Sequence, residues 1–213
     1  PLSGMLQMLN MQINCWFGGV GVGFMNYYAF LIIAVFISGL MVGRTPEYIG
    51  KKINAFDMKM VCIIILVPPL CLLLATAITT LFPAAQQLQA DGGWLSNTGS
   101  HGFSEILYAY TSMAGNNGSA FAGFQANTVL TNVMGGTVML LVRFLPMVAV
   151  IYLAQSLASK KYVPAGSGTL ATTSPLFVGF LIVIVLIVGA LTFLPVLALG
   201  PLAEFFTQLH VLG

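Results

Sequence analysis

The segment Gly115-Asn116-Asn117-Gly118 has the residue types in this sequence that are best suited to binding an ion. Glycine and asparagine adopt left-handed or extended backbone at the least cost, so a short loop of them can turn several carbonyl oxygens toward one axis. Carbonyls arranged in this way replace the hydration shell of an ion in the filters of cation channels. The alternative is a plain helix stop followed by a turn. We favour the filter because the segment is predicted to lie at membrane depth.

Arg143 is the only charged residue inside a long apolar stretch. At the centre of a bilayer an arginine costs about 2.5 to 3.5 kcal/mol on insertion scales, so its side chain should face a cavity or a polar partner. We favour a cation that faces the path of an ion. The alternative is an arginine bound to backbone carbonyls at a helix break beside Pro146.

The third unusual segment is FGGVGVG at residues 17–23, which contains Gly18, Gly19, Gly21 and Gly23. It is not a dinucleotide-binding loop, because no strand precedes it and no acidic residue follows at the required distance. Four closely spaced glycines indicate either unwound, mobile backbone or close helix packing. The sequence alone does not choose between a hinge and a packing face.

The elements that position these residues are predicted to be membrane-spanning helices. Of 213 residues, 58% are hydrophobic and 6% are charged, and the mean hydropathy is +0.97, which excludes a water-soluble globular protein. A bilayer core of about 30 Å requires about 20 helical residues. The apolar stretches long enough to cross it are 22–42, 60–82, 126–155 and 174–199. The net charge of +2 arises from two short loops, which gives no indication of nucleic-acid binding.

The orientation of these spans follows from the distribution of lysine and arginine. Basic residues follow the first and third spans, namely Arg44, Lys51, Lys52, Lys59, Lys160 and Lys161, whereas residues 83–102 contain none. We therefore expect the two basic loops, 43–59 and 156–173, to be cytoplasmic. The tail at 200–213 should then lie outside.

A short helix at residues 103–114 does not fit the pattern of spans. Its 12 residues reach only about 18 Å, so it should enter the membrane from outside and return. Re-entrant backbone is tolerated only where it is buried in protein or lines a water-filled cavity. The negative end of the helix dipole would then favour a cation beside residues 115–118, and Glu105 would lie in the first turn at the positive end.

The chain lacks the residues that a membrane enzyme or a proton-coupled carrier would need. A membrane enzyme requires paired carboxylates, a nucleophile with a base, or metal ligands at membrane depth, and the five acidic residues and two histidines flank the spans instead. A proton-coupled carrier usually has an acid or histidine within the membrane. Sodium coupling through carbonyls would leave no such trace. No phosphate-binding loop is present, and the only aspartate of residues 43–59 is Asp57.

Several motifs make the chain resemble a known family along its whole length. They are GRTPEYIGKKI at 43–53, HGFSEILYAYTSMAGNNGSAFAGF at 101–124, SGTLATTSPLFVGF at 167–180 and GALTFLPVLALGPLAE at 189–204. The chain is similar to the KdpA family, the potassium-binding subunits of bacterial Kdp potassium-transporting ATPases. It begins at Pro1 without an initiator methionine, and we expect it to be the C-terminal part of such a subunit.

The resemblance implies an all-α polytopic membrane protein with the fold of the superfamily of potassium transporters. In that fold, four repeats of helix, pore helix, filter and helix surround one pore. Residues 60–155 would be the fourth repeat, with helix 60–82, outside loop 83–102, pore helix 103–114, filter 115–119 and helix 126–155. Residues 1–42 would belong to the second helix of the third repeat, and 174–199 would be an extra C-terminal helix.

The resemblance also implies roles for individual residues. Asn116, Asn117 and Gly118, together with Gly115, match the fourth filter segment. The glycines at 18, 19, 21 and 23 match an intramembrane loop thought to gate the path. Arg44 matches an arginine that closes this helix at the cytoplasmic face, and Arg143 matches one below the filter.

Two departures from the family limit this transfer. Many members have a third asparagine where this chain has Gly115, and many have Gly-Glu in the region of Asn14-Cys15-Trp16. The second departure puts in doubt any salt bridge between the glycine-rich loop and either arginine.

The function implied is binding of K⁺ at an extracellular-facing filter and its guidance across the bacterial inner membrane. Energy would come from a P-type ATPase subunit, with small accessory subunits and membrane lipid as further partners, and this chain would bind no nucleotide. The alternative is a cation channel or a secondary K⁺ or Na⁺ transporter of the same superfamily. Because three of the four filter segments would lie upstream, we expect no transport from this part alone.

Overall fold

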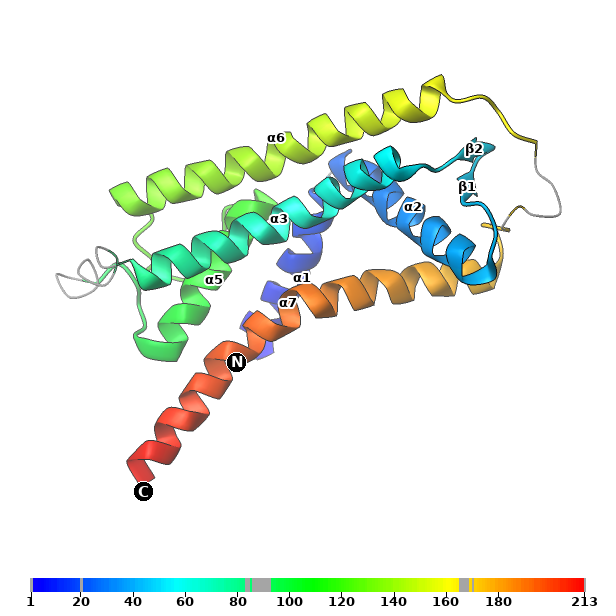
Figure 1. The fold of residues 1–213 in the computed structure, drawn as a ribbon. Helices are drawn as coiled ribbons and strands as arrows, with labels where there is room; N and C mark the ends of the chain where they lie inside the picture. Colours follow the sequence, from blue (N-terminus) through cyan, green and yellow to red (C-terminus); the bar gives the residue numbers. More distant parts are fainter. Residues whose placement is uncertain are drawn as a thin grey trace. The chain divides into compact units, whose positions relative to one another are not determined.

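The computed structural model describes residues 2–19, 21–82, 85, 93–164, 169 and 171–212. Parts of the predicted loops at 83–102 and 156–173 therefore lie outside the described residues, as does Val20. The elements in chain order are the helices α1 (Leu2–Phe17) and α2 (Val22–Val42), the strands β1 (Glu47–Tyr48) and β2 (Lys51–Lys52), and the helices α3 (Ala55–Leu81), α5 (Gly99–Gly115), α6 (Val129–Ser159) and α7 (Pro175–Leu212) (Figure 1).

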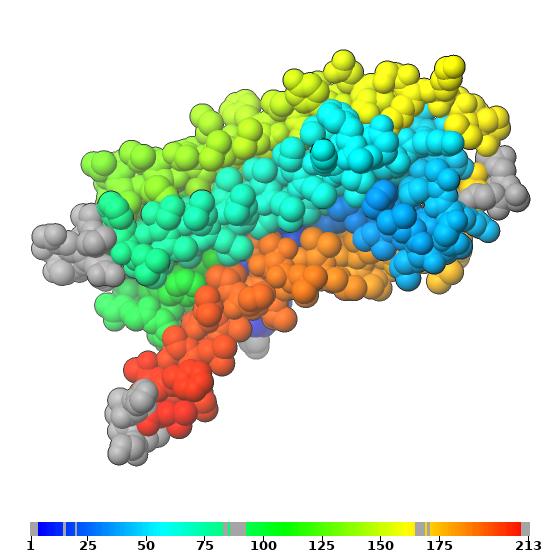
Figure 2. Space-filling model, in the orientation of Figure 1, coloured from blue at the N-terminus to red at the C-terminus, as the bar shows by residue number. Residues whose placement is uncertain are grey.

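In the described part of the chain, four helices are long and apolar enough to cross a membrane, which confirms the predicted all-α membrane protein with four apolar spans. They cover Val22–Val42, Ala55–Leu81, Val129–Ser159 and Pro175–Leu209. Large apolar side chains are exposed on these helices, for example Leu66, Leu70, Leu140, Phe144, Ile151, Leu186 and Leu191. Figure 2 shows atoms of α3, α6 and α7 at the molecular surface. Such apolar surfaces suit contact with lipid or with other membrane helices.

The chain divides into two compact units, each of which we describe by itself. Unit 1 comprises Pro1–Trp16, Pro68–Arg143 and Gly189–Gly213, and unit 2 comprises Phe17–Val67 and Phe144–Val188. The helices α3, α6 and α7 each contribute residues to both units. The predicted filter falls in unit 1 and the glycine-rich segment falls in unit 2.

The core of unit 1 is built around α5. The Tyr110 hydroxyl lies 2.7 Å from the Thr79 hydroxyl, and both side chains are buried. The backbone of α6 approaches α5 closely at Gly135, where an added Cβ would lie 2.6 Å from the Met113 sulfur. The indole of Trp16 packs at 5.2 Å from the ring of Phe193, which joins the end of α1 to α7.

In unit 2, a polar cluster joins the start of α3, the end of α6 and the β-hairpin. Asp57 is fully buried, forms an ion pair with Lys160, and accepts a 2.6 Å hydrogen bond from the Ser156 hydroxyl. The Lys160 ammonium also donates to the carbonyl of Lys52 at 2.8 Å. These contacts fasten the start of α3, the end of α6 and the β-hairpin to one another. A buried carboxylate is tolerated in this place because it is paired and hydrogen-bonded.

Capping residues, rather than apolar composition, determine where two of the long helices begin. Asn54 and Asp57 form reciprocal bonds at the start of α3, with the Asn54 N–H 2.7 Å from the Asp57 carboxylate and the Asp57 N–H 3.0 Å from the Asn54 amide oxygen. Thr128 and Thr131 form a similar pair before α6. Because such caps satisfy the free N–H groups of the first turn, α3 starts at 55 rather than 60, and α6 starts at 129 rather than 126.

Other boundaries also differ from the predicted ones. The helix α5 begins at Gly99, so Glu105 is not in its first turn as predicted. The helix α6 continues to Ser159, and α7 continues to Leu212 although Pro195 and Pro201 lie inside it. Residues 200–212, predicted to form a tail, are therefore helical.

A short antiparallel hairpin between α2 and α3 was not predicted. It pairs Glu47 with Lys52 and Tyr48 with Lys51, and its turn places Ile49 and Gly50 at φ values of 50° and 69°. Positive φ at both central residues is the geometry of a type I′ turn, which asparagine and glycine usually occupy. The turn was not predicted because isoleucine, at the first of these positions, is not a residue typical of such a turn.

Candidate functional site

The N-terminal half of α5 is fixed by a buried carboxylate. Only 1% of Glu105 is exposed, and its carboxylate accepts bonds from the main-chain N–H groups of Ser96 and Asn97, at 3.0 and 3.1 Å, and from the Asn97 amide at 3.0 Å. These bonds fold the segment before α5 back onto the second turn of the helix. Charge-assisted bonds of this kind are stronger than neutral ones.

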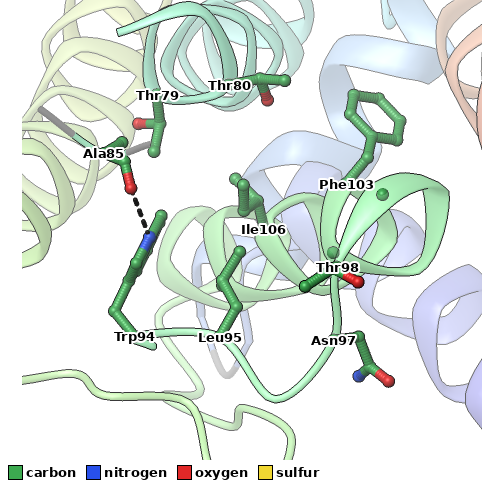
Figure 3. Close-up of a pocket in the computed structure, with 11 residues that line it drawn as sticks. Thr79, Thr80, Ala85, Trp94, Leu95, Asn97, Thr98, Phe103 and Ile106 are labelled. Carbon is green, nitrogen blue, oxygen red and sulfur yellow. Dashed lines mark hydrogen bonds between the residues drawn. The ribbon is translucent and has the colours of Figure 1, made fainter. Parts of the chain in front are cut away.

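A cavity of about 350 Å³ lies beside this half of α5 (Figure 3). Its wall includes Thr79 from α3 and Phe103 and Ile106 from α5, together with Trp94, whose indole donates to the Ala85 carbonyl at 3.0 Å. None of the described residues that line it is charged. The Glu105 bonds, rather than this cavity, hold α5 at its N-terminal side.

The C-terminal end of α5 changes direction at Asn116. This residue adopts left-handed backbone, with φ 58° and ψ 26°, and its N–H bonds the Met113 carbonyl at 3.1 Å, while the Asn117 N–H bonds the Ser112 carbonyl at 3.2 Å. The helix stop considered in the sequence analysis is therefore present. The cap uses N–H groups, so it leaves the carbonyls of the following residues available.

The carbonyl oxygens of this segment divide into two groups. The Ala114 carbonyl accepts a 3.1 Å bond from the Asn116 side chain, and the Gly115 carbonyl accepts a 3.4 Å bond from the Asn14 amide of α1. In the described part of the chain, no hydrogen bond uses the main-chain carbonyl of Asn116, Asn117 or Gly118. All three of these residues are exposed. Three consecutive unpaired carbonyls are thus available to a ligand, whereas Gly115, also predicted for the filter, has its carbonyl occupied by α1.

The glycine-rich segment in unit 2 interrupts the helix between α1 and α2. Gly18, Gly19 and Gly21 have φ values of 69°, 87° and 80°, which other residues rarely adopt. Gly23 is helical, and an added Cβ there would lie 3.0 Å from the carbonyl oxygen of Phe17. The first three glycines therefore break the helix, and the fourth allows a close backbone approach to Phe17.

The two predicted arginines lie in different environments. Arg44 follows the end of α2, is exposed, and donates from its guanidinium to the Thr169 carbonyl at 3.4 Å. Arg143 lies in α6, half-buried, in the same unit as residues 115–118. The structure thus groups Arg143 with the predicted filter, and Arg44 with the glycine-rich segment.

The expectation from the sequence that Arg143 faces the path of an ion predicts that Arg143→Met in the full-length protein increases ion leak or uncouples transport from ATP hydrolysis. The guanidinium charge raises the free energy of a cation about 8 Å away by about 2 kcal/mol at an effective dielectric of about 20. This difference corresponds to an approximately thirtyfold lower rate of cation passage. Arg143→Lys keeps the charge and should largely preserve coupling. The measurement is ⁸⁶Rb⁺ flux into vesicles with and without ATP. If Met behaves like the native residue in both conditions, Arg143 is only a structural anchor.

Sequence reasoning missed the partners that hold the segment. Asn14 was recorded only as a departure from a family pattern, and Ser112 and Tyr108 not at all. Asn14 and Gly115 lie 101 positions apart, and no periodicity in the sequence links them. Without a Cβ at residue 115 the Asn14 amide can approach, since an added Cβ would lie 3.2 Å from its nitrogen. Only the lack of a side chain at Gly115 could have indicated, from the sequence, that another residue approaches this position closely.

Comparison with known proteins gives a consistent result. The family model described as KdpA, potassium-transporting ATPase A subunit, matches residues 1–206. The chain is 56% identical over 208 residues to a "potassium-transporting ATPase potassium-binding subunit" of Listeria monocytogenes serotype 4a, covering 97% of this chain and 36% of the relative. Proteins of the same name from Parabacteroides distasonis and Clostridium perfringens are 54% and 53% identical, over 97% and 98% of this chain and 37% and 35% of theirs. The chain thus spans about a third of the length of these relatives.

Proposed function

Since this chain belongs to the KdpA family of membrane proteins, we propose that it forms part of the potassium-binding subunit of an ATP-driven potassium uptake complex. Within that subunit, residues 116–118 contribute one wall of a selectivity filter. The observation that carries this proposal is a run of three exposed residues, 116–118, whose carbonyls accept no hydrogen bond in the described part of the chain, at the end of a short helix that is buried and anchored. Backbone carbonyls are the ligands that replace water around a potassium ion.

The other three walls of the filter and the energy source would belong to other parts of the assembly. The named relatives are about three times as long as this chain, so further filter segments would come from the rest of the subunit. In the described part of the chain, no cluster of three or more His, Cys, Asp or Glu side chains could hold a metal ion. ATP hydrolysis is assigned to a P-type ATPase subunit, with accessory subunits and lipid as further partners.

The proposed location is the bacterial inner membrane, with α5 entering from outside and the C-terminus outside. The four apolar helices and the basic residues near the hairpin support this orientation. Glycines 18, 19 and 21 would form the gate in the path, with Arg44 at its cytoplasmic end. A channel or secondary carrier remains the alternative on fold alone, but the names of the relatives favour the pump subunit.

The proposal predicts which polypeptide is phosphorylated. Full-length subunit should be purified alone and in complex with its partners, and each sample should be tested for ATP hydrolysis and phosphoenzyme formation. We expect potassium-stimulated hydrolysis only from the complex, with the acid-stable phosphate on the partner. Phosphorylation of the isolated subunit would overturn the proposal, as would potassium uptake that persists unchanged after ATP is depleted.

A further inference from the structure

A cluster of hydroxyl groups surrounds the side chain of Asn117. The Ser112 hydroxyl donates to the Asn117 amide oxygen, and the Ser119 N–H and hydroxyl lie 3.3 and 3.4 Å from the same oxygen. Ser112 is fully buried in α5, whereas Asn117 and Ser119 are exposed. The amide oxygen of Asn117 is therefore turned back against the helix.

Tyr108 extends this cluster along α5. Its hydroxyl lies 3.2 Å from the Ser119 hydroxyl and donates to the Gln7 amide oxygen of α1 at 3.3 Å. Its ring packs against Phe121 with centroids 4.3 Å apart, and only 5% of the residue is exposed. A rigid aromatic side chain one turn before Ser112 thus supports the loop from behind.

From this arrangement we propose that Tyr108, Ser112 and Ser119 determine ion selectivity by positioning the backbone of residues 116–118. The Asn117 amide oxygen then accepts hydrogen bonds that hold the loop in place, and it does not coordinate the ion. The inference rests on the proposed function, because it deepens the role of the same segment. Ser119 falls within the filter range predicted from the sequence, 115–119, whereas Tyr108 and Ser112 were predicted only as part of the pore helix 103–114.

The physical reason is that discrimination between similar cations depends on how freely carbonyl groups adjust around each of them. Residues 116 and 118 have left-handed backbone, and the loop has no main-chain ladder to hold it. The hydroxyl cluster connects the side chains of Asn117 and Ser119 to the buried surface of α5. Loss of one such bond should let the carbonyls relax toward ions of other radii.

The experiment uses the full-length subunit in its complete complex with Tyr108→Phe and Ser119→Ala. Potassium- and rubidium-stimulated ATP hydrolysis is titrated for each variant, with sodium and ammonium as further ions. We expect the apparent affinity for potassium to fall by about two- to tenfold and the discrimination between ions to shrink, as loss of one hydrogen bond predicts. Ser119→Thr keeps the hydroxyl and should restore the native selectivity.

Tyr110→Phe is the matched control. It removes a buried hydroxyl from the same helix, but that hydroxyl bonds Thr79 at 2.7 Å and makes no hydrogen bond to residues 115–119. Ion selectivity should stay native in this variant even where thermal stability falls.

The outcomes distinguish this inference from the proposed function. If Tyr108→Phe and Ser119→Ala keep native ion selectivity while Gly118→Ser changes it, the hydroxyl cluster has no role in selectivity and the inference is wrong, although the filter stands. If Gly118→Ser also keeps native affinity and selectivity, the filter itself is wrong. Equal losses in Ser119→Ala and Ser119→Thr would also contradict the inference, because the hydroxyl would then be irrelevant.

Discussion

Gly118→Ser in the full-length protein should weaken potassium uptake by about tenfold or more and admit smaller cations. Gly118 has φ 74°, and no atom lies within 4 Å of an added Cβ, so the effect comes from backbone conformation and not from crowding. In a residue with a Cβ, left-handed backbone raises the conformational free energy by roughly 1 to 2 kcal/mol. The loop would relieve this strain by turning the peptide groups on either side, which carry the proposed ligand carbonyls.

The same cause predicts an order among substitutions at residue 118. Asparagine tolerates left-handed backbone and should be mildest, serine intermediate, and valine most severe, because β-branched side chains are least tolerated there. Gly118→Asp adds a charge beside the ion and should alter selectivity for that further reason. Concentration-dependent ⁸⁶Rb⁺ uptake with competing ions measures both properties.

Gly136→Ala provides the control for this series. Gly136 lies within α6, and again no atom lies within 4 Å of an added Cβ, but its backbone is helical. Uptake should be unchanged in this variant. Native affinity and selectivity throughout the residue 118 series would contradict the filter assignment.

Glu105→Ala should destabilise the protein by about 2 to 4 kcal/mol. The substitution leaves the three donors on Ser96 and Asn97 without their shared acceptor and opens a cavity in the core around α5. Unsatisfied donors cost about 1 to 3 kcal/mol each when buried, and water can reach part of this exposed segment. Glu105→Gln keeps the shape and one acceptor oxygen, so its loss should be about half as large.

Thermal or denaturant unfolding of the purified full-length complex measures this effect. Glu204→Gln is the control, since Glu204 is a partly exposed acid whose contact is with His101 at 3.4 Å. Its unfolding midpoint should match that of the native protein. Equal midpoints for Glu105→Ala and Glu204→Gln would show that the buried carboxylate contributes nothing to stability.

The sequence predicted well those features that depend on composition over many residues. The four spans follow from apolar runs, and the break after α1 follows from glycines that few other residues could replace. Helix starts were misplaced because the Asn54–Asp57 and Thr128–Thr131 caps act through single side chains that hydropathy ignores. The start of α5 was missed for a related reason, since polar residues from Gly99 onward extend the helix beyond its apolar part.

The loop residues of the candidate site were predicted from the sequence, whereas the side chains that hold the loop were not. Asn116 and Gly118 were identified because their residue types favour the left-handed backbone that they adopt. The bonds that hold this loop were missed because they join positions such as Gln7 and Tyr108, 101 residues apart, through common polar side chains. Long-range pairing of that kind leaves no periodic trace in one sequence.

The close approach of α6 to α5 at Gly135 constrains how this family can diverge. A methyl group at residue 135 would collide with the thioether of Met113, two residues before the helix end from which the loop departs. An alanine at 135 is thus compatible with the present helix separation only if the side chain at 113 becomes shorter or takes another rotamer. A larger residue at 135 should therefore occur together with a shorter side chain at 113, or with a Met113 that has left its present rotamer.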